Sequence, residues 1–263
     1  MISHEIAADG LVSPQEVRLA CREGRLSGTT RGLAFGFVQC NLVVIRERYA
    51  YDFLLYCQRN QRACPVLEVT DTGDPEPKRL APGADLRTDL PRYAVYRDGS
   101  RLPDVTSIKE LWRDDFVSFL IGSGISFDQA LEKAGVQTTQ DRWVLRTSLQ
   151  TIPAGRFQGP LVVTMRWLSP AQAITATQVT ARFPFNHGAP LHIGDPTVIG
   201  ADLTEPYLGP PVEAIPSSIV PVFWACGVTP QEAALSAKID VMITHSPGHG
   251  FVTDLEAGRL ALP

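Results

Sequence analysis

The sequence has no long hydrophobic run, no strong charge of one sign and no basic stretch leading into an apolar segment at its start. No apolar stretch approaches the roughly 20 residues that a membrane-spanning helix needs. The net charge is −4, so no general attraction to nucleic acid or to an acidic membrane surface is expected. The start of the chain does not resemble a signal peptide, and we therefore expect a cytoplasmic protein.

Several motifs of common active sites are also missing. The five cysteines are irregularly spaced and form no CxxC pair, which argues against a zinc ribbon and a disulfide framework. There is no HExxH motif, no GxSxG motif and no phosphate-binding loop with its lysine. No metal motif is therefore present, although four of the five histidines fall within residues 187–249. A divalent cofactor, Mn²⁺ or Mg²⁺, is left open.

What is present centres on residues 219–250. An apolar run ends at Cys226, Gly227 breaks it, and Thr229 followed by proline is typical of a helix start. A second apolar run then ends at His245. This order predicts a strand, a helix and a strand, hence two parallel strands with their carboxyl ends on one rim. A thiol, the imidazoles of His245 and His249 and a helix start would share that rim.

The rest of the chain predicts a mixed architecture. Helices are expected over residues 14–24, 49–60 and 107–119, and strands over 35–45, 64–70 and 93–96. Three extended runs, 143–149, 161–167 and 173–183, are close enough to indicate an antiparallel meander. We predict an α/β fold (α+β overall). A three-layer α/β/α main subdomain comprises residues 1–104 plus 186–263, and a two-layer α+β subdomain, 105–185, is inserted into it.

Each candidate site residue has a structural alternative. Cys226 is a nucleophile if a helix N-terminus or an imidazole lowers its pKa, and otherwise a buried inert thiol. Ser123 and Gly124 precede a predicted helix and could hold a carboxylate, or simply form a turn. Asp71 ends a strand and could serve in acid–base or metal chemistry, although a turn explains its Asp-Thr-Gly-Asp-Pro context better. The arginines considered for carboxylate binding are Arg31, Arg92, Arg166 and Arg182.

Seven segments together resemble the D-glutamate cyclase family. They are residues 37–41 (FVQCN), 64–71 (CPVLEVTD), 119–123 (FLIGS), 182–190 (RFPFNHGAP), 193–196 (IGDP), 222–231 (VFWACGVTPQ) and 244–249 (THSPGH). The resemblance spans nearly the whole chain. One position departs from it, because family members commonly have a cysteine where this chain has Ser123.

The resemblance implies a hydro-lyase, a carbon–oxygen lyase of amino acid metabolism that acts on a small amino or hydroxy acid. The reaction it suggests closes D-glutamate to 5-oxo-D-proline with loss of water. It also implies two α/β subdomains, in agreement with the division above. Such a cyclisation needs a base, an acid, donors for an oxyanion and an anchor for the α-carboxylate.

We assign these roles as a hypothesis. His245 and His249 are the acid and base, and Asn186 and His187 orient the substrate. Backbone N–H groups from Gly227 to Thr229, or at Ser123 and Gly124, hold an oxyanion or carboxylate. The alternative is a non-catalytic protein that binds small carboxylic acids or regulates another protein. The sequence does not indicate an oligomeric state, and a homo-oligomer is compatible with it.

Overall fold

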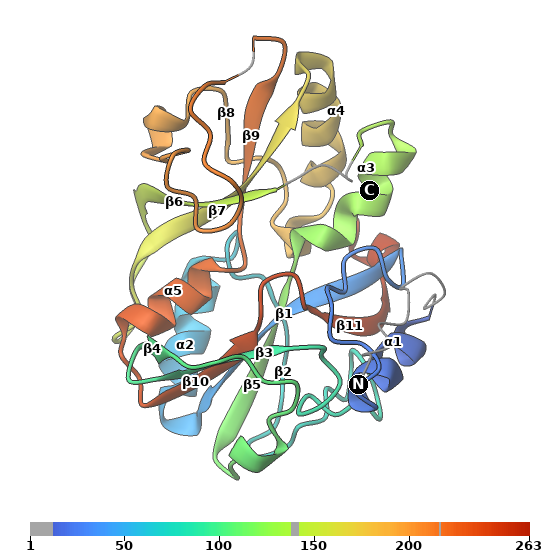
Figure 1. Ribbon diagram of the computed structural model, residues 1–263, viewed down its shortest axis with the longest axis vertical. Coiled ribbons are helices and arrows are strands. Elements are labelled where there is room, and N and C mark those ends of the chain that lie inside the picture. The colour runs from blue at the N-terminus through green and yellow to red at the C-terminus, as the bar shows by residue number, and fades with distance from the viewer. Residues whose placement is uncertain (1–12, 138–141, 216) are drawn as a thin grey trace, which may run out of the picture.

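The computed structural model describes residues 13–137, 142–215 and 217–263, which form two units stacked along the long axis of the molecule (Figure 1). Each unit is built on one antiparallel sheet. The large sheet has the strand order β2-β5-β1-β10-β3-β4, with β11 paired to β1. The small sheet has the order β6-β7-β9-β8.

The strands and helices have the following bounds. The strands of the large sheet are β1 (Phe37–Arg46), β2 (Val66–Val69), β3 (Tyr93–Arg97), β4 (Ser100–Arg101), β5 (Phe116–Gly122), β10 (Val241–His245) and β11 (Phe251–Glu256). Those of the small sheet are β6 (Trp143–Gln150), β7 (Pro160–Leu168), β8 (His192–Ile193) and β9 (Val220–Ala225). The α-helices are α1 (Pro14–Arg22), α2 (Glu47–Arg59), α3 (Asp128–Lys133), α4 (Pro170–Ala181) and α5 (Thr229–Ser236). Short 3₁₀ helices are η1 (Lys109–Leu111), η2 (Gly124–Phe127), η3 (Pro184–Asn186), η4 (Pro196–Ile199) and η5 (Ala257–Leu260).

The two faces of the large sheet are covered differently. Helices α2 and α5 pack on one face, where Phe53 of α2 meets Phe119 of β5 edge to face, with ring centroids 4.8 Å apart. On the other face, the irregular segment 75–92 supplies Leu80, Leu86 and Leu90 to a second apolar core. The protein thus combines β-sheets with helices that pack on them, which confirms the predicted α/β class.

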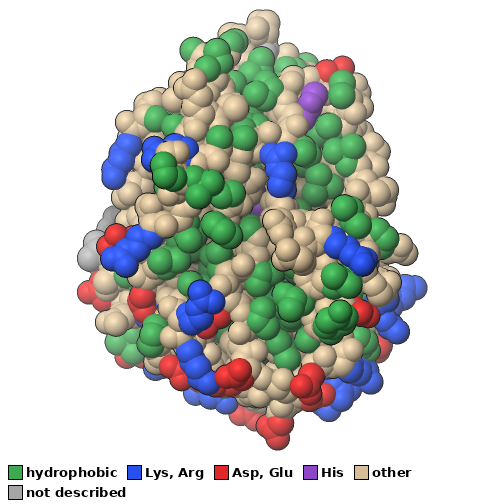
Figure 2. Space-filling view, turned by 180° about the vertical axis from the view of Figure 1, so that it is seen from behind, with side chains coloured by type: hydrophobic (Ala, Val, Ile, Leu, Met, Phe, Trp, Pro, Cys, Tyr) green, Lys and Arg blue, Asp and Glu red, His purple; other side chains and the backbone are tan. Residues whose placement is uncertain are grey.

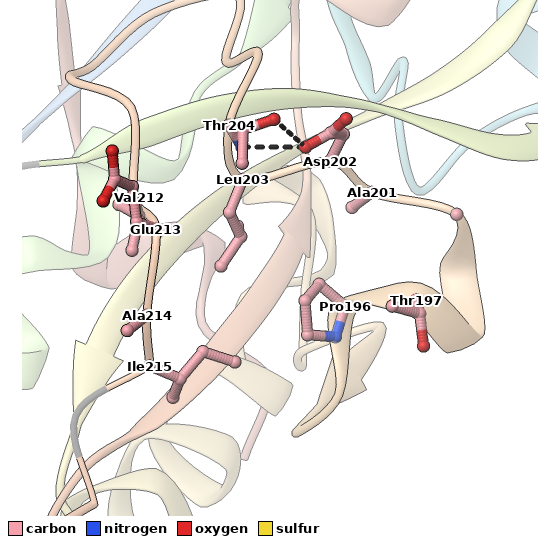
Figure 3. Close-up of a pocket in the computed structure, with 11 residues that line it drawn as sticks. Pro196, Thr197, Ala201, Asp202, Leu203, Thr204, Val212, Glu213, Ala214 and Ile215 are labelled. Carbon is pink, nitrogen blue, oxygen red and sulfur yellow. Dashed lines mark hydrogen bonds between the residues drawn. The ribbon is translucent and has the colours of Figure 1, made fainter.

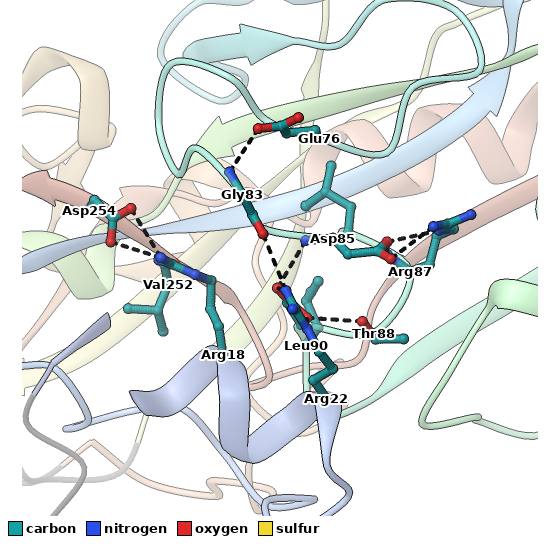
Figure 4. A network of polar contacts seen from close by, with 12 residues as sticks. Arg18, Arg22, Glu76, Gly83, Asp85, Arg87, Thr88, Leu90, Val252 and Asp254 are labelled. Carbon is teal, nitrogen blue, oxygen red and sulfur yellow. Dashed lines mark hydrogen bonds and ion pairs between the residues drawn. The ribbon is translucent and has the colours of Figure 1, made fainter. Parts of the chain in front are cut away.

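Helix α1 is held against the end of the large sheet by ion pairs (Figure 4). The guanidinium of Arg18 donates to both carboxylate oxygens of Asp254 at 2.9 and 3.0 Å, and to the carbonyl of Val252 at 2.9 Å. Arg22 donates to both oxygens of Asp89. Because Asp89 is buried, its pairing with Arg22 ties α1 to the segment 75–92.

The small sheet is covered by α3 and α4 on one face and by the segment around η4 on the other. Its strands alternate, so the even-numbered residues of β7 and β9 lie on the α3 and α4 face. Thr164 pairs with Trp224, and Arg166 pairs with Val222. The end of this face that points to the large sheet forms one wall of the cavity described below.

Three predictions about the elements are wrong. Strands β9 and β10 belong to different sheets and pair antiparallel with their neighbours, so the expected parallel pair does not exist. The segment 107–119 holds a short 3₁₀ helix and then strand β5, because its apolar residues complete the centre of the large sheet. Residues 170–181 form helix α4 instead of a strand. The Ser169 hydroxyl and the Gln172 side chain cap that helix reciprocally, and this local signal outweighs the alternation of residues 175–181.

The division between the sheets does not follow the predicted subdomain limits. Strand β5, within 105–185, belongs to the large sheet, whereas β8 and β9, within 186–263, belong to the small one. On the face seen in Figure 2, charged side chains gather over the part that holds the large sheet, and the part above it is poorer in charge. Within the described part of the chain, no helix has the length and apolar character required to cross a bilayer.

Candidate active site

A cavity of about 340 Å³ lies between the two sheets. Its floor comes from Gln39 to Asn41 of β1 and from the segments that follow β5 and β10. Its opposite wall comes from the small sheet, through the side chains of β7 and β9 and the turn after β9. The residues predicted for the site that line it are Ser123, Gly124, His187, Cys226, Gly227 and His245. The expected meeting of Cys226, Gly227 and His245 therefore occurs, although their strands come from two sheets.

Close backbone contacts hold these segments together. A Cβ on Gly227 would lie 2.0 Å from Nδ2 of Asn41, and one on Gly122 would lie 1.9 Å from the carbonyl oxygen of Phe185. The Asn41 amide donates to the carbonyl of Gly122 at 3.0 Å. Glycine at position 227 lets the turn after β9 approach β1, and glycine at position 122 lets the end of β5 approach η3.

His245 enters the cavity as a neutral ring with a defined tautomer. The backbone N–H of Leu42 donates to its Nδ1 at 3.2 Å, and Nε2 of Gln231 lies 3.4 Å from the same atom. Because Nδ1 accepts, the proton of the neutral ring is on Nε2. Burial, with a smaller effect of His249, lowers the pKa of His245 to about 4. His245 therefore offers an N–H donor near neutral pH.

His187 has the opposite tautomer. Its Nδ1 lies 2.9 Å from the carbonyl oxygen of Arg62, which can only accept, so Nδ1 carries the proton and Nε2 has a free lone pair. Burial lowers the pKa of His187 to about 4. The backbone at His187 has φ of +79°, which is uncommon for a residue other than glycine and often marks a functional position. The imidazole edge faces Gly124, where an added Cβ would lie 3.7 Å from Cδ2.

Two arginines form the cationic part of the cavity. Arg166 donates to Oδ1 of Asp128 at 2.8 Å, and Arg142 donates to Oδ2 of the same carboxylate. The Arg166 guanidinium also lies over the rings of Phe127 and Trp224, at 5.5 and 5.6 Å from their centroids. Among the described residues, the buried Nε and Nη1 of Arg166 and the buried Nε of Arg142 have no hydrogen-bond partner. Burial and then Arg166 lower the pKa of Arg142 to about 9, so the Arg142 guanidinium is charged at pH 7.

Cys226 lines the cavity without the electrostatics of a nucleophile. Burial raises the pKa of its thiol, the opposite of the shift that a reactive thiolate requires. The structure therefore favours the inert alternative for this residue.

Four predicted site residues do not line the cavity. Asn186 is buried next to it, where Nδ2 donates to the Ser123 carbonyl at 3.1 Å and Oδ1 has no partner within the described residues. Nδ1 of His249 bonds to the carbonyl of Pro247 at 2.8 Å. Thr229 is the first residue of α5, not its cap, and its hydroxyl bonds to Val162 of β7. Asp71 is exposed and pairs with Lys78, as the turn alternative implies.

The sequence reasoning missed Arg142 and Asp128. The sequence did contain a signal for the polar side of the small sheet. Thr164 and Arg166 are polar residues two positions apart in the apolar strand β7, so they lie on the same face of the sheet. No local pattern could show that Asp128 joins Arg142 to Arg166, because the three residues come from different elements. Among the residues with described positions, no three His, Cys, Asp or Glu side chains cluster so as to hold a metal ion.

A second hollow lies on the far side of the small sheet (Figure 3). It has a volume of about 500 Å³, and its wall includes Pro196, Leu203 and Ile215. Its Asp202 accepts hydrogen bonds from the N–H and hydroxyl of Thr204. The described residues that line it include no imidazole, thiol or arginine, so the cavity between the sheets is the candidate active site.

A cavity lined by titratable side chains with shifted pKa values is the default candidate for an active or binding site. A family model described as D-glutamate cyclase matches residues 117–254. A protein named "Putative hydro-lyase" from Bacillus licheniformis is 50% identical over 92% of this chain and 94% of its own length. Proteins of the same name from Thermoanaerobacter sp. and Bacillus subtilis are 49% and 47% identical, each over 95% of this chain, and over 96% and 100% of their own lengths.

The chain belongs to the D-glutamate cyclase family. The family and the names of these relatives support a lyase-type function. A solved structure of a nitrogen repressor-like protein from Methanococcus jannaschii is 10% identical, with a TM-score of 0.39 over 87% of this chain and 90% of that one.

Proposed function

We propose that the cavity between the sheets is the active site of a hydro-lyase that cyclises D-glutamate to 5-oxo-D-proline. One observation carries the proposal. The same cavity is lined by two neutral histidines of opposite tautomer and by two arginines with buried guanidinium N–H groups that have no hydrogen-bond partner among the described residues. The arginines supply an anchor for the α-carboxylate, since buried donors of this kind are matched by a carboxylate. The histidines supply the two proton-handling groups.

The roles follow from the tautomers. Nε2 of His187 accepts a proton from the amine as its nitrogen attacks the γ-carboxyl carbon. Nε2–H of His245 donates a hydrogen bond to the oxygen that becomes negative, as a neutral imidazole can when its pKa is low. The ammonium group of D-glutamate first passes one proton to the γ-carboxylate, so that a neutral amine attacks a carboxylic acid. The proton that His187 takes up then goes to the leaving hydroxyl as the carbon–oxygen bond breaks, and the oxygen leaves as water. Both rings are held at Nδ1, which leaves Nε2 of each for these steps.

This assignment replaces His249 by His187 as the base. The reason is position, because His187 lines the cavity and His249 does not. The two hypotheses make different predictions for the same pair of variants, so one experiment separates them.

The test is turnover of D-glutamate by the purified protein, followed by NMR for 5-oxoproline, with and without Mn²⁺ or Mg²⁺. Asparagine is a suitable replacement for each histidine, because its amide can occupy the place of Nδ1 while Nε2 is lost. It also tolerates the positive φ at position 187 better than other side chains. We expect His187→Asn and His245→Asn to lower kcat by at least 10²-fold, the lower end for acid–base groups.

His249→Asn is the matched control, and it should retain turnover. Loss of activity in His249→Asn with full activity in His187→Asn would restore the earlier assignment. Tight binding of D-glutamate without product under any of these conditions would favour the non-catalytic carboxylate-binding alternative.

A further inference from the structure

Gln231 is a buried polar residue in contact with the imidazole of His245. It is the third residue of α5 and is 3% exposed, and its Nε2 lies 3.4 Å from Nδ1 of His245. Helix α5 otherwise contributes Ala233 and Ala234 to the apolar core on this face of the large sheet. A buried amide needs hydrogen-bond partners, and the imidazole is one. Gln231 is not among the residues that line the cavity, so it acts on a ligand through His245.

The backbone of Leu42 determines which atom of the amide faces the ring. Strand β1 pairs with β11 before Leu42 and with β10 after it, so Leu42 lies where the partner strand changes. Its N–H donates to Nδ1 of His245 at 3.2 Å. A backbone N–H can only donate, so Nδ1 presents its lone pair. The Gln231 side chain must therefore turn its NH₂ group, and not its oxygen, toward the same atom.

The chemistry of position 231 decides what His245 offers to a ligand. Two donors at Nδ1 leave the proton of the neutral ring on Nε2. A carboxylate at position 231 would have the opposite effect, because it binds an imidazole through an Nδ1–H group and leaves a lone pair on Nε2. Carboxylate–histidine pairs fix the tautomer in this way in serine proteases and in zinc sites.

We propose that Gln231 is a positioning residue whose amide, together with the Leu42 N–H, keeps the imidazole proton of His245 on Nε2 and so makes this ring a hydrogen-bond donor and not a base. This inference rests on the proposed function, in which Nε2–H of His245 donates to the oxygen that becomes negative. It explains how two neutral histidines in one cavity have different roles. The Arg62 carbonyl makes His187 the base, and two donors make His245 the donor.

Nitrogen-15 NMR of the histidine rings tests the tautomer in the free protein. Protonated and unprotonated ring nitrogens have well-separated ¹⁵N shifts, and the His245→Asn variant identifies the His245 signals among those of the five histidines. At pH 7 we expect Nε2 of His245 to be protonated and Nδ1 to be unprotonated. A protonated Nδ1 in the wild-type protein would overturn the inference.

Gln231→Glu keeps the shape of the side chain and replaces the donor by an acceptor. Once the new carboxyl has lost its proton, the single proton of the neutral ring should be on Nδ1, bonded to the carboxylate. We therefore expect Nε2 of His245 to lose its proton in this variant as the pH is raised from 6 to 9. At pH 9, kcat for D-glutamate should be at least 10²-fold below that of the wild type at the same pH. A ring that keeps its proton on Nε2 over this whole range, or a wild-type kcat, would overturn the inference.

Gln231→Met is the matched variant, because it removes the amide without introducing an acceptor. The Leu42 N–H remains, so Nε2 of His245 should stay protonated. The value of kcat should fall by about 2- to 10-fold, the effect of losing one neutral hydrogen bond. Unchanged turnover would show that the amide contributes nothing, and a loss as large as in Gln231→Glu would show that packing matters and the tautomer does not. Either result would refute the inference.

A double-mutant cycle separates a positioning role from a purely structural one. If Gln231 acts through His245, the losses from Gln231→Glu and His245→Asn should not multiply. The double variant should then have the kcat of His245→Asn alone, within about twofold. Losses that multiply would mean that Gln231 acts elsewhere in the protein, and the inference would fall.

Failure of this inference can be told from failure of the proposed function, because the ring signals are recorded without substrate. The expected tautomers in the wild type and in Gln231→Glu, with no product from D-glutamate, would refute the proposed function and leave the control of the tautomer by Gln231 in place. Product from the wild-type protein together with a protonated Nδ1 of His245 would refute the inference alone.

Discussion

Acidification from pH 7 to pH 5 should destabilise this protein through His187 and His245. Both rings are buried, at 3% and 6% exposure, and the pKa of each is lowered from 6.5 to about 4. Between these two values the unfolded chain binds protons that the folded protein does not, so the free energy of unfolding falls as the pH falls. The stabilisation is complete above pH 6.5 and is lost progressively down to pH 4.

The magnitude follows from the same pKa values. For one histidine with pKa 6.5 unfolded and about 4 folded, linkage gives a loss of about 2 kcal/mol between pH 7 and pH 5. The two rings together contribute about 4 kcal/mol, a large part of the 5–15 kcal/mol typical of a folded domain. The aspartates whose pKa is shifted have values below 3.8, beneath this window.

Urea unfolding at pH 5, 6 and 7 measures this loss. His187→Asn should reduce the pH-dependent loss by about half, to ~2 kcal/mol, because one titrating ring remains. A wild-type protein equally stable at pH 7 and pH 5 would refute the reasoning. So would a double variant, His187→Asn with His245→Asn, that loses as much stability as the wild type.

Three further substitutions test the geometry around the site. Gly122→Ala places a Cβ against the Phe185 carbonyl and should lower the free energy of unfolding by about 1–3 kcal/mol in urea titrations; wild-type stability would mean that the two backbones are not in contact. Thr229→Val removes the hydroxyl that is hydrogen-bonded to the Val162 N–H and carbonyl, so the free energy of unfolding should fall by about 1–3 kcal/mol in the same assay. An unchanged urea midpoint would contradict those hydrogen bonds. Asp71→Asn removes only an exposed ion pair, so turnover and melting temperature should not change; a large loss of turnover would return Asp71 to the active site.

Much of the secondary structure could be read from the sequence because its signals are local. The Ser13 and Glu16 capping box starts α1 where the sequence predicts a helix. The strands β1, β2, β3, β6 and β7 lie within or close to the predicted runs. Where two local signals competed, as in residues 169–181, the capping box was the more reliable guide, because it satisfies specific helix N–H groups.

The candidate site could be predicted only in part. The loops after β9 and β10 contain Cys226, Gly227 and His245, and the sequence alone placed these residues together. The reasoning behind that prediction was wrong, because it assumed that the two strands pair in parallel. A strand–helix–strand order does not determine whether both strands belong to one sheet. Pairing is decided by which strands already occupy the neighbouring positions, here β7 beside β9 and β1 beside β10.

The sequence by itself determined the family, the α/β class and several of the segments that surround the cavity between the sheets. The tertiary structure decided which histidine faces the cavity and in which tautomer, through Arg62 and Leu42, which lie far from His187 and His245 in the chain. It also decided that Asp128 lies between Arg142 and Arg166 and pairs with both. The physical reason is the separation along the chain of the residues that interact. Helix caps and hydrophobic alternation involve residues a few positions apart. Tautomers, burial and ion pairs depend on contacts between distant residues, which only the folded chain creates.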